Sequence, residues 1–135
     1  LSYTTFRFTN LAVRPVEGST ETAPRWTVTF DVTNAGARAG AAVPQVYVGQ
    51  RDPRVPRPRK ELKGFSKIWL EPGETRRVSV PLDARSLAYY DVAGARWRVD
   101  PATFDIMIGS SSADADIALR DTLTIRRGVT ITLRP

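Results

Sequence analysis

The chain has 135 residues, of which 41% are hydrophobic and 25% charged, and its formal net charge is +6. This length fits a single domain, since one hydrophobic core usually organises between about 50 and 200 residues. The chain contains no cysteine and no histidine, which excludes disulfides and thiolate metal sites and argues against zinc hydrolysis and triad chemistry. No apolar run is long enough to cross a bilayer. Because the only methionine is Met107, we expect a processed or trimmed piece of a longer protein.

The N-terminal third of the chain alternates apolar and polar side chains with a period of two, which is typical of half-buried strands. The clearest example covers residues 26–34, whose apolar members are Trp26, Val28, Phe30 and Val32. Phe6 and Phe8 indicate an earlier strand. Residues 43–48 are apolar on both faces, which predicts a strand in the middle of a sheet.

A proline-rich and basic segment follows these strands. Pro53, Pro56 and Pro58 remove backbone donors and favour irregular chain, so residues 52–59 are predicted to form a long loop. The positive charges of this segment are Arg51, Arg54, Arg57, Arg59, Lys60 and Lys63. Beyond it, the apolar residues from Leu62 to Leu70 do not alternate strictly, which predicts a bulge near Ser66 and Lys67.

The C-terminal half predicts further short strands separated by turns. Residues 76–82 and 104–108 alternate regularly, and a turn at 92–94 predicts a hairpin between residues 87–91 and 96–99. Residues 84–87 form at most one helical turn, and one or two more strands are expected around Arg127 and Gly128, reaching Leu133. Short strands at this spacing favour an all-β antiparallel sandwich.

The carboxylates do not predict a catalytic site. Glycoside hydrolysis commonly needs two of them, one as acid and one as nucleophile or base. Asp114 and Asp116 are the closest pair, but the serines at 110–112 predict a flexible, solvated turn around them. Asp83, Asp91 and Asp100 fall at strand ends, where capping of turns is the simpler role.

Exposed aromatic rings offer a second kind of site, because sugar-binding modules place pyranose faces against tryptophan and tyrosine. Trp26 shares its phase with Val28 and is assigned to the core, and we expect Trp97 and Tyr90 to fill the space between layers. Trp69 lies between Ile68 and Leu70, so it is predicted to point outward. Carbohydrate binding and packing against another domain both remain open for Trp69.

The basic loop raises the question of nucleic acid, since arginines neutralise phosphates. No helix-turn-helix or RNA-recognition signature is present, and aromatic residues are not interleaved with the arginines. We therefore predict no nucleic acid, no membrane, no cofactor and no metal ion as partner. A solvated loop, or a surface that docks on an acidic neighbouring domain, explains these charges better.

Several motifs resemble the fibronectin type III-like domain at the C-terminal end of glycoside hydrolase family three enzymes, chiefly β-glucosidases and β-xylosidases. They cover residues 1–6, 32–36 with Gly40, 43–48, 57–65, 70–75, 87–91, Trp97 and 109–112. The segment 57–65 is the most specific of them. The sequence departs from the family at residues 100–104, where a proline-glycine or alanine-glycine turn is usual. The resemblance covers about residues 1–120 and implies an immunoglobulin-like or fibronectin type III-like sandwich, with residues 121–135 as an extension or extra edge strand.

The resemblance also implies an accessory role, because in such enzymes the catalytic residues belong to upstream domains. The chain would brace the catalytic domains of a β-glucosidase, and a loop reaching the rim of the active site is compatible with the family. The candidate docking residues are Arg57, Arg59, Lys60, Glu61 and Lys63. In the separate domain we expect their charges to face water and to contribute little to stability. The alternative is a polysaccharide-binding module that uses Trp69 and the basic loop.

Overall fold

The structure is a computed structural model that describes residues 5–131. Twelve strands and two short helical turns follow one another within these residues. The elements are β1 (Phe6–Pro15), β2 (Arg25–Asn34), β3 (Gly40–Ala42), β4 (Gln45–Gln50), β5 (Glu61–Phe65), β6 (Ile68–Leu70), β7 (Thr75–Asp83), α1 (Ala84–Leu87), β8 (Tyr89–Asp91), β9 (Arg96–Val99), β10 (Ala102–Gly109), η1 (Asp114–Asp116), β11 (Ile117–Ile125) and β12 (Val129–Ile131). Residues 1–4, which belong to the first family motif named above, and Leu133, the expected end of the last strand, lie outside the described part of the chain.

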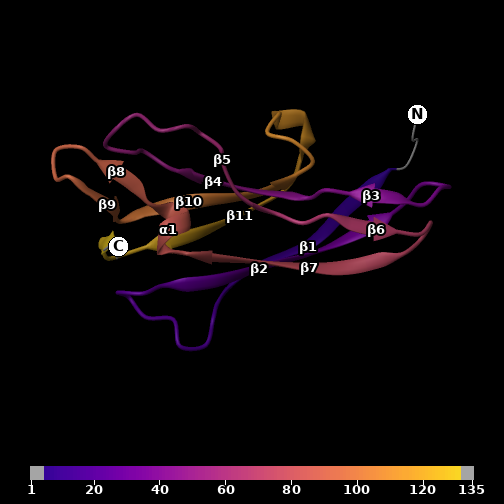
Figure 1. Ribbon diagram of the computed structural model, residues 1–135, viewed down its shortest axis with the longest axis horizontal. Helices are drawn as coiled ribbons and strands as arrows, with labels where there is room; N and C mark the ends of the chain where they lie inside the picture. Colours follow the sequence, from indigo (N-terminus) through magenta and orange to yellow (C-terminus); the bar gives the residue numbers. More distant parts are fainter. Residues whose placement is uncertain (1–4, 132–135) are drawn as a thin grey trace.

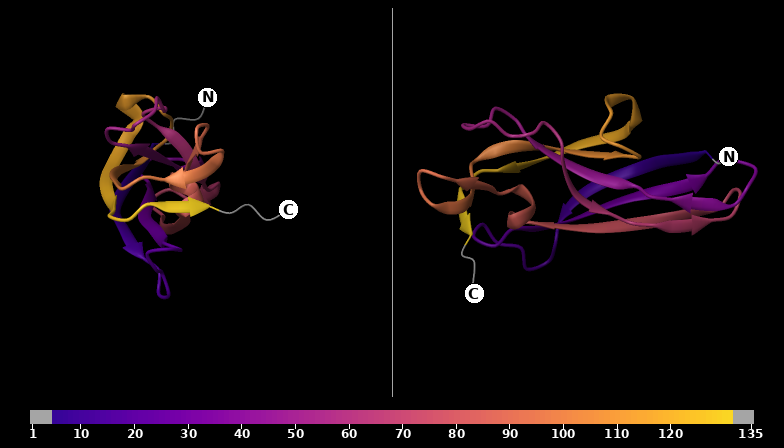
Figure 2. Two further views of the ribbon diagram at one scale, coloured as in Figure 1. Left: turned by 90° about the vertical axis from the view of Figure 1, so that its left-hand side faces the viewer. Right: turned by 45° about the horizontal axis from the view of Figure 1, so that its top comes forward.

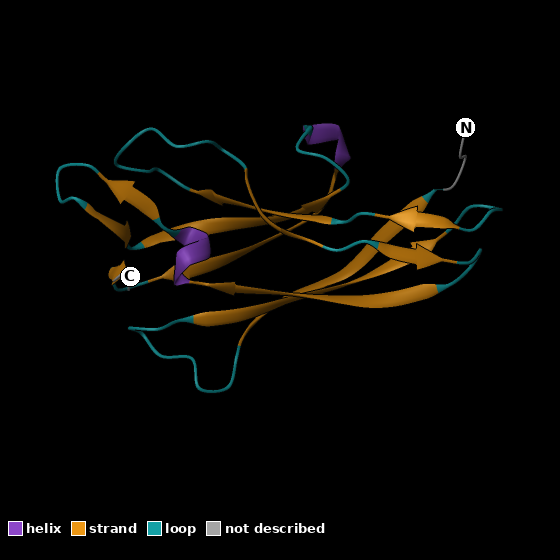
Figure 3. Ribbon diagram, in the orientation of Figure 1, coloured by secondary structure: helices purple, strands orange, loops and turns teal. Residues whose placement is uncertain are grey.

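Two antiparallel sheets form the layers of a β-sandwich. One sheet has the strand order β1-β2-β7 and the other has the order β11-β10-β4-β5. Figure 1 shows them running along the long axis of the molecule, and Figure 3 shows how little of the chain is helical. The predicted all-β sandwich is therefore confirmed, and residues 43–48 do contribute a central strand, which begins at Gln45.

The core lies between these layers and follows the predicted alternation. On β2, Val28, Phe30 and Val32 are fully buried, and each faces a partner on the neighbouring strand in register, for example Phe30 opposite Val78. The second layer contributes Phe104, Ile106 and Ile108 from β10, which pair with β4. Branched and aromatic side chains of this kind pack well on a pleated surface.

Two smaller sheets occupy the ends of the sandwich. The pair β3-β6 lies at the end where β1 begins, and the sheet β12-β9-β8 lies at the opposite end (Figures 1 and 2). At the β3-β6 end, Asn34 is fully buried, and its side-chain amide donates to the carbonyls of Arg38 and Leu70 at 2.8 and 3.0 Å. This side chain fixes the predicted turn at 34–36 against β6.

Two local predictions were wrong. At Ser66 and Lys67 the chain leaves one sheet for another, since Phe65 pairs with β4 whereas Ile68 pairs with β3. The irregular register lies instead opposite Val46 and Tyr47, next to Lys63. Leu87 belongs to α1 and not to the hairpin strand. Residues 121–125 form the second half of β11, the outermost strand of its sheet.

Candidate functional site

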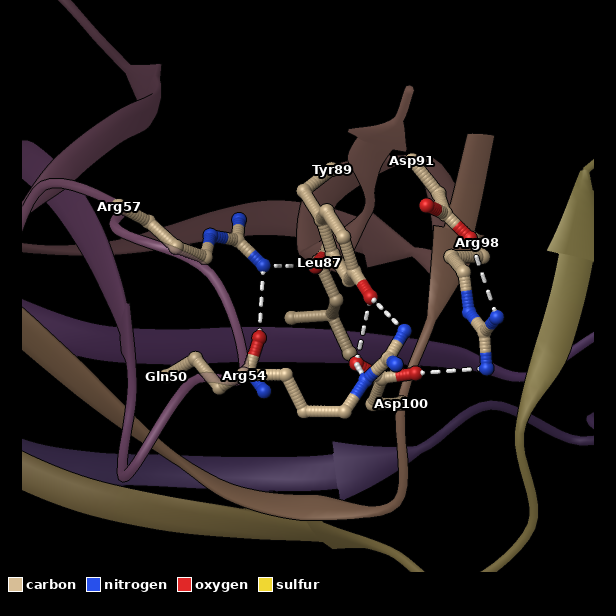
Figure 4. Close-up of polar contacts among 8 residues, drawn as sticks. All are labelled: Gln50, Arg54, Arg57, Leu87, Tyr89, Asp91, Arg98 and Asp100. Carbon is tan, nitrogen blue, oxygen red and sulfur yellow. Dashed lines mark hydrogen bonds and ion pairs between the residues drawn. The ribbon is translucent and has the colours of Figure 1, made fainter. Parts of the chain in front are cut away.

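The most concentrated polar contacts of the domain surround Arg57, in the loop of residues 51–60 that joins β4 to β5. Its side chain is only 5% exposed, and its Nε donates to Glu61 Oε2 at 2.9 Å. Its Nη1 donates to Gln50 Oε1 at 2.8 Å and to the carbonyl of Leu87 at 3.0 Å (Figure 4). Most donors of the guanidinium are thus directed at acceptors within the domain.

The same guanidinium also contacts the segment that leads into β8. Its Nη2 donates to the carbonyl of Ala88 at 3.3 Å, and its central carbon lies 5.5 Å from the centre of the Tyr89 ring. A guanidinium over an aromatic face is attracted by the negative face of the ring. Arg57 therefore holds the loop against α1 and β8.

A second cluster is centred on Asp100, whose side chain is 7% exposed. Its Oδ2 accepts hydrogen bonds from the Tyr89 hydroxyl at 2.6 Å and from Arg54 Nε at 3.1 Å. Its Oδ1 lies 3.0 Å from Arg98 Nη2. Arg54 also donates to the Tyr89 hydroxyl at 2.7 Å, and Arg98 reaches Asp91 at 3.2 Å (Figure 4). The cluster joins loop 51–60, β8 and β9.

The electrostatics of these clusters favour ionised carboxylates. Burial alone would raise the pKa of Asp100, but hydrogen bonds from Tyr89 and Arg54, together with the Arg98 charge, hold it below its ordinary value. The pKa of Glu61 is lowered in the same way by Arg57 and Lys63 against the effect of burial. A glycosidase acid needs the opposite shift, because it must stay protonated near neutral pH.

Asp114 and Asp116, the pair of carboxylates closest to each other in sequence, are exposed, and each accepts a hydrogen bond from a neighbouring side chain. Asp114 accepts from Lys60, and this hydrogen bond lowers its pKa. Asp116 accepts from the Ser111 hydroxyl at 2.7 Å. Asp83 caps α1 through the backbone N–H of Ser86, as predicted for a strand end. Asp91 caps the turn after β8 as expected, through the backbone N–H of Gly94, and also binds Arg98. Asp100 does not cap a turn but binds Arg54, Arg98 and the Tyr89 hydroxyl.

Of the five predicted docking residues, four make contacts within the domain and one, Arg59, is exposed. The charge of Arg57 does not face water, contrary to our expectation, because four acceptors within the domain surround it. Glu61 and Lys63 form an ion pair of 3.3 Å beside it. Lys60 is mostly buried on Asp114, whereas Arg59 is exposed.

Loop 51–60 runs closely over the outer face of the second layer. A Cβ atom at Gly49 would lie 2.2 Å from the carbonyl oxygen of Arg59, so only glycine allows this approach. Two side chains on that outer face of the sheet, Tyr47 and Met107, are consequently buried although they lie outside the sandwich core.

The aromatic predictions had mixed outcomes. Trp69 points outward as expected and is 58% exposed, with its indole N–H 3.4 Å from Glu71 Oε1. Tyr90 and Trp97 do not fill the space between layers; they are 47% and 38% exposed and pack edge to face. The reason is that they share the outer face of the β8-β9 hairpin, while Tyr89 takes the inner one.

Sequence reasoning missed an apolar patch on β5, which we call the β5 patch, formed by Leu62 and Phe65. Leu62 is paired with Tyr47 and Phe65 with Gln45, so both lie on the outer face of the second layer, and Phe65 is 65% exposed. The irregular spacing after residue 60 was the available signal, because an apolar residue out of phase with the core must point outward.

Comparison with known proteins places this domain in a family. The family model described as the fibronectin type III-like domain matches residues 42–112. The chain belongs to the fibronectin type III-like domain family. The domain is 38% identical over 134 residues to thermostable β-glucosidase B of Acetivibrio thermocellus, which covers 99% of this chain and 17% of that protein. It is 40% identical over 114 residues to a β-glucosidase of Rhizobium radiobacter, covering 84% of this chain and 14% of that protein.

Solved structures agree with this assignment. β-Glucosidase 3B of Thermotoga neapolitana, solved with glucose, superimposes with a TM-score of 0.84 and 31% identity over 98% of this chain and 17% of its own. A family three β-glucosidase of Bifidobacterium adolescentis gives 0.83 and 34% identity over 93% of this chain and 18% of its own. The fibronectin type III-like domain thus spans about one sixth of the glycosidases it matches, where it is part of a larger chain.

In residues 5–131 no helix is long and apolar enough to span a membrane. Within the same range no group of three or more acidic side chains is arranged to hold a metal ion.

Proposed function

We propose that this domain is a non-catalytic accessory part of a family three β-glucosidase and that it braces the catalytic domains. The observation that supports this best is the unequal coverage: nearly all of this chain matches a small fraction of each β-glucosidase. Asp100, Glu61 and Asp114 support it chemically, because hydrogen bonds and cationic partners hold their pKa values below the ordinary range. None of these groups suits a general acid.

The surface proposed to dock on the catalytic domains combines the β5 patch with Arg59. β5 is an edge strand, and an exposed phenylalanine on an edge is commonly covered by another element. Arg59 lies over the same outer face, since its carbonyl touches Gly49 of β4. A charged residue beside an apolar patch gives the docking both burial and orientation.

The buried position of Arg57 changes what the basic loop does in this proposal. Arg57, Glu61 and Lys63 shape the loop from within, and Arg59 remains available for another domain. Prolines at 53, 56 and 58 restrict the loop further, which reduces the entropy lost when it docks. Contacts within the domain therefore order the loop before it docks on another domain.

The test replaces Phe65 with serine, both in the 135-residue chain and in the full-length glycosidase that contains it. The isolated domain should change by no more than about 0.5 kcal/mol, since the ring is already in water. The full-length enzyme should lose about 1.5–3 kcal/mol of interdomain stabilisation, the contribution of one buried phenylalanine. Thermal midpoints and residual activity after heating measure both effects.

The matched control is Val92→Ser, because Val92 is an exposed apolar residue in the turn between β8 and β9 and lies away from β5. This change should leave the thermal midpoint and the residual activity after heating unaltered, in the isolated domain and in the full-length enzyme respectively. If the full-length enzyme tolerates Phe65→Ser as well as Val92→Ser, the β5 patch is not the docking surface.

A further inference from the structure

The exposed pair Tyr90 and Trp97 borders a hollow of about 370 Å³ on the loop side of the β8-β9 hairpin. We call it the aromatic hollow, and its lining includes Val55, Pro56, Glu61, Lys63, Tyr90 and Trp97. Its volume falls within the range of small-molecule sites, about 300–1,000 Å³. The hollow is separate from the outward face of β6, where Trp69 lies.

The two rings of the hollow are held in fixed positions. Tyr90 and Trp97 are direct partners across the hairpin, with ring centres 5.5 Å apart and an interplanar angle of 74°. The hairpin is tied by the ion pair of Asp91 and Arg98. The Tyr90 hydroxyl and the Trp97 indole N–H have no hydrogen-bond partner within residues 5–131. The rings therefore present flat apolar area together with polar edges.

The polar side of the hollow is equally constrained. Glu61 receives Arg57 on one carboxylate oxygen at 2.9 Å and Lys63 on the other at 3.3 Å. A lysine ammonium carries three donors, and only one of them is needed for Glu61. The carboxylate keeps lone pairs for further donors, because each of its oxygens can accept more than one hydrogen bond.

This combination fits a neutral polyol ring better than an ion. The charges of Glu61 are already balanced by Arg57 and Lys63, so an anionic ligand would have to compete with an existing carboxylate. A pyranose has a C–H face that packs on an aromatic ring and hydroxyls that both donate and accept at its rim. Aromatic area on one side and a paired acid and base on the other match those two surfaces.

We propose that the aromatic hollow is a weak subsite for one pyranose unit of a neutral oligosaccharide, which stacks on Trp97 and hydrogen-bonds Glu61 and Lys63. The site adds a binding function to the accessory role and does not depend on docking through β5. Because it uses a single ring platform at an open surface, its dissociation constant should be on the order of 1 mM.

The experiment titrates cellotetraose into the 135-residue chain and follows the three indole N–H signals by NMR, assigned with single tryptophan variants. Saturable shifts are expected for the Trp97 signal. Trp97→Ala should weaken binding by at least about tenfold, and Trp97→Phe, which keeps a ring, should restore part of it. Trp69→Ala is the matched control and should change binding by less than about twofold. Unchanged thermal midpoints show that each variant is folded.

Three results would overturn the proposal. The first is the absence of saturable shifts up to about 10 mM ligand, tenfold above the expected constant. The second is loss of binding in Trp69→Ala but not in Trp97→Ala, which assigns the sugar to β6. The third is a Trp97 signal that responds in the isolated chain but not in the full-length glycosidase, which shows that another domain covers the hollow.

Discussion

Two regions of this domain, the core between the sheets and the contact of loop 51–60 with β8 and β9, are stabilised in different ways. Between the sheets β1-β2-β7 and β11-β10-β4-β5, apolar side chains interdigitate around Phe30 and Phe104. Where loop 51–60 meets β8 and β9, arginines bind carboxylates and carbonyls, with Arg57 and Asp100 at the centres. The difference shows that local alternation of apolar residues is enough to form the sandwich. The position of loop 51–60 depends instead on polar pairs between residues far apart in the sequence.

The largest effect should come from the apolar region. Phe30 is fully buried and packs edge to face on Phe8, with ring centres 6.3 Å apart. Phe30→Ala should lower the free energy of unfolding by about 3–5 kcal/mol, because removal of a core aromatic ring loses its burial and leaves a cavity. Denaturant titration measures it. A loss below about 1 kcal/mol would mean that the sandwich does not depend on this packing.

A smaller but selective effect should come from the polar region, and it sharpens the comparison. Arg57→Met keeps the aliphatic bulk but removes charge-assisted hydrogen bonds to Glu61 and two carbonyls, so the isolated domain should lose about 1.5–3 kcal/mol. Arg59→Met is the matched control from the same loop and should change stability by less than about 0.5 kcal/mol, because Arg59 is exposed. Equal effects of both changes would remove the distinction between an internal and a surface arginine.

The sequence predicted the layers well because a period of two is a local property. Residues 26–34, 76–82 and 104–108 each reveal a buried face without knowledge of any partner strand. The sheet change at Ser66 and Lys67 could not be predicted, since a bulge and a crossing between sheets give the same loss of alternation. Only the partner strands distinguish the two.

The site was predicted less completely. Segment 57–65 was singled out as a specific motif. Arg57 appeared to be a surface charge because its acceptors, the carbonyls of Leu87 and Ala88, are about thirty residues away and carry no sequence signal. Asp100 was assigned to a turn because its partner Arg54, 46 residues away, carries no sequence signal either. Tyr90 and Trp97 were placed between layers because alternation cannot tell which face of a terminal hairpin is covered.

The central claim, that this domain does not itself hydrolyse glycosides, is tested most directly by assaying the pure 135-residue chain on an aryl β-glucoside near neutral pH. The account predicts a rate equal to that of buffer alone, because its paired carboxylates stay ionised and Asp114 and Asp116 are bound to Lys60 and Ser111. Turnover that disappears in Asp114→Asn or Asp116→Asn, while the fold is preserved, would contradict it.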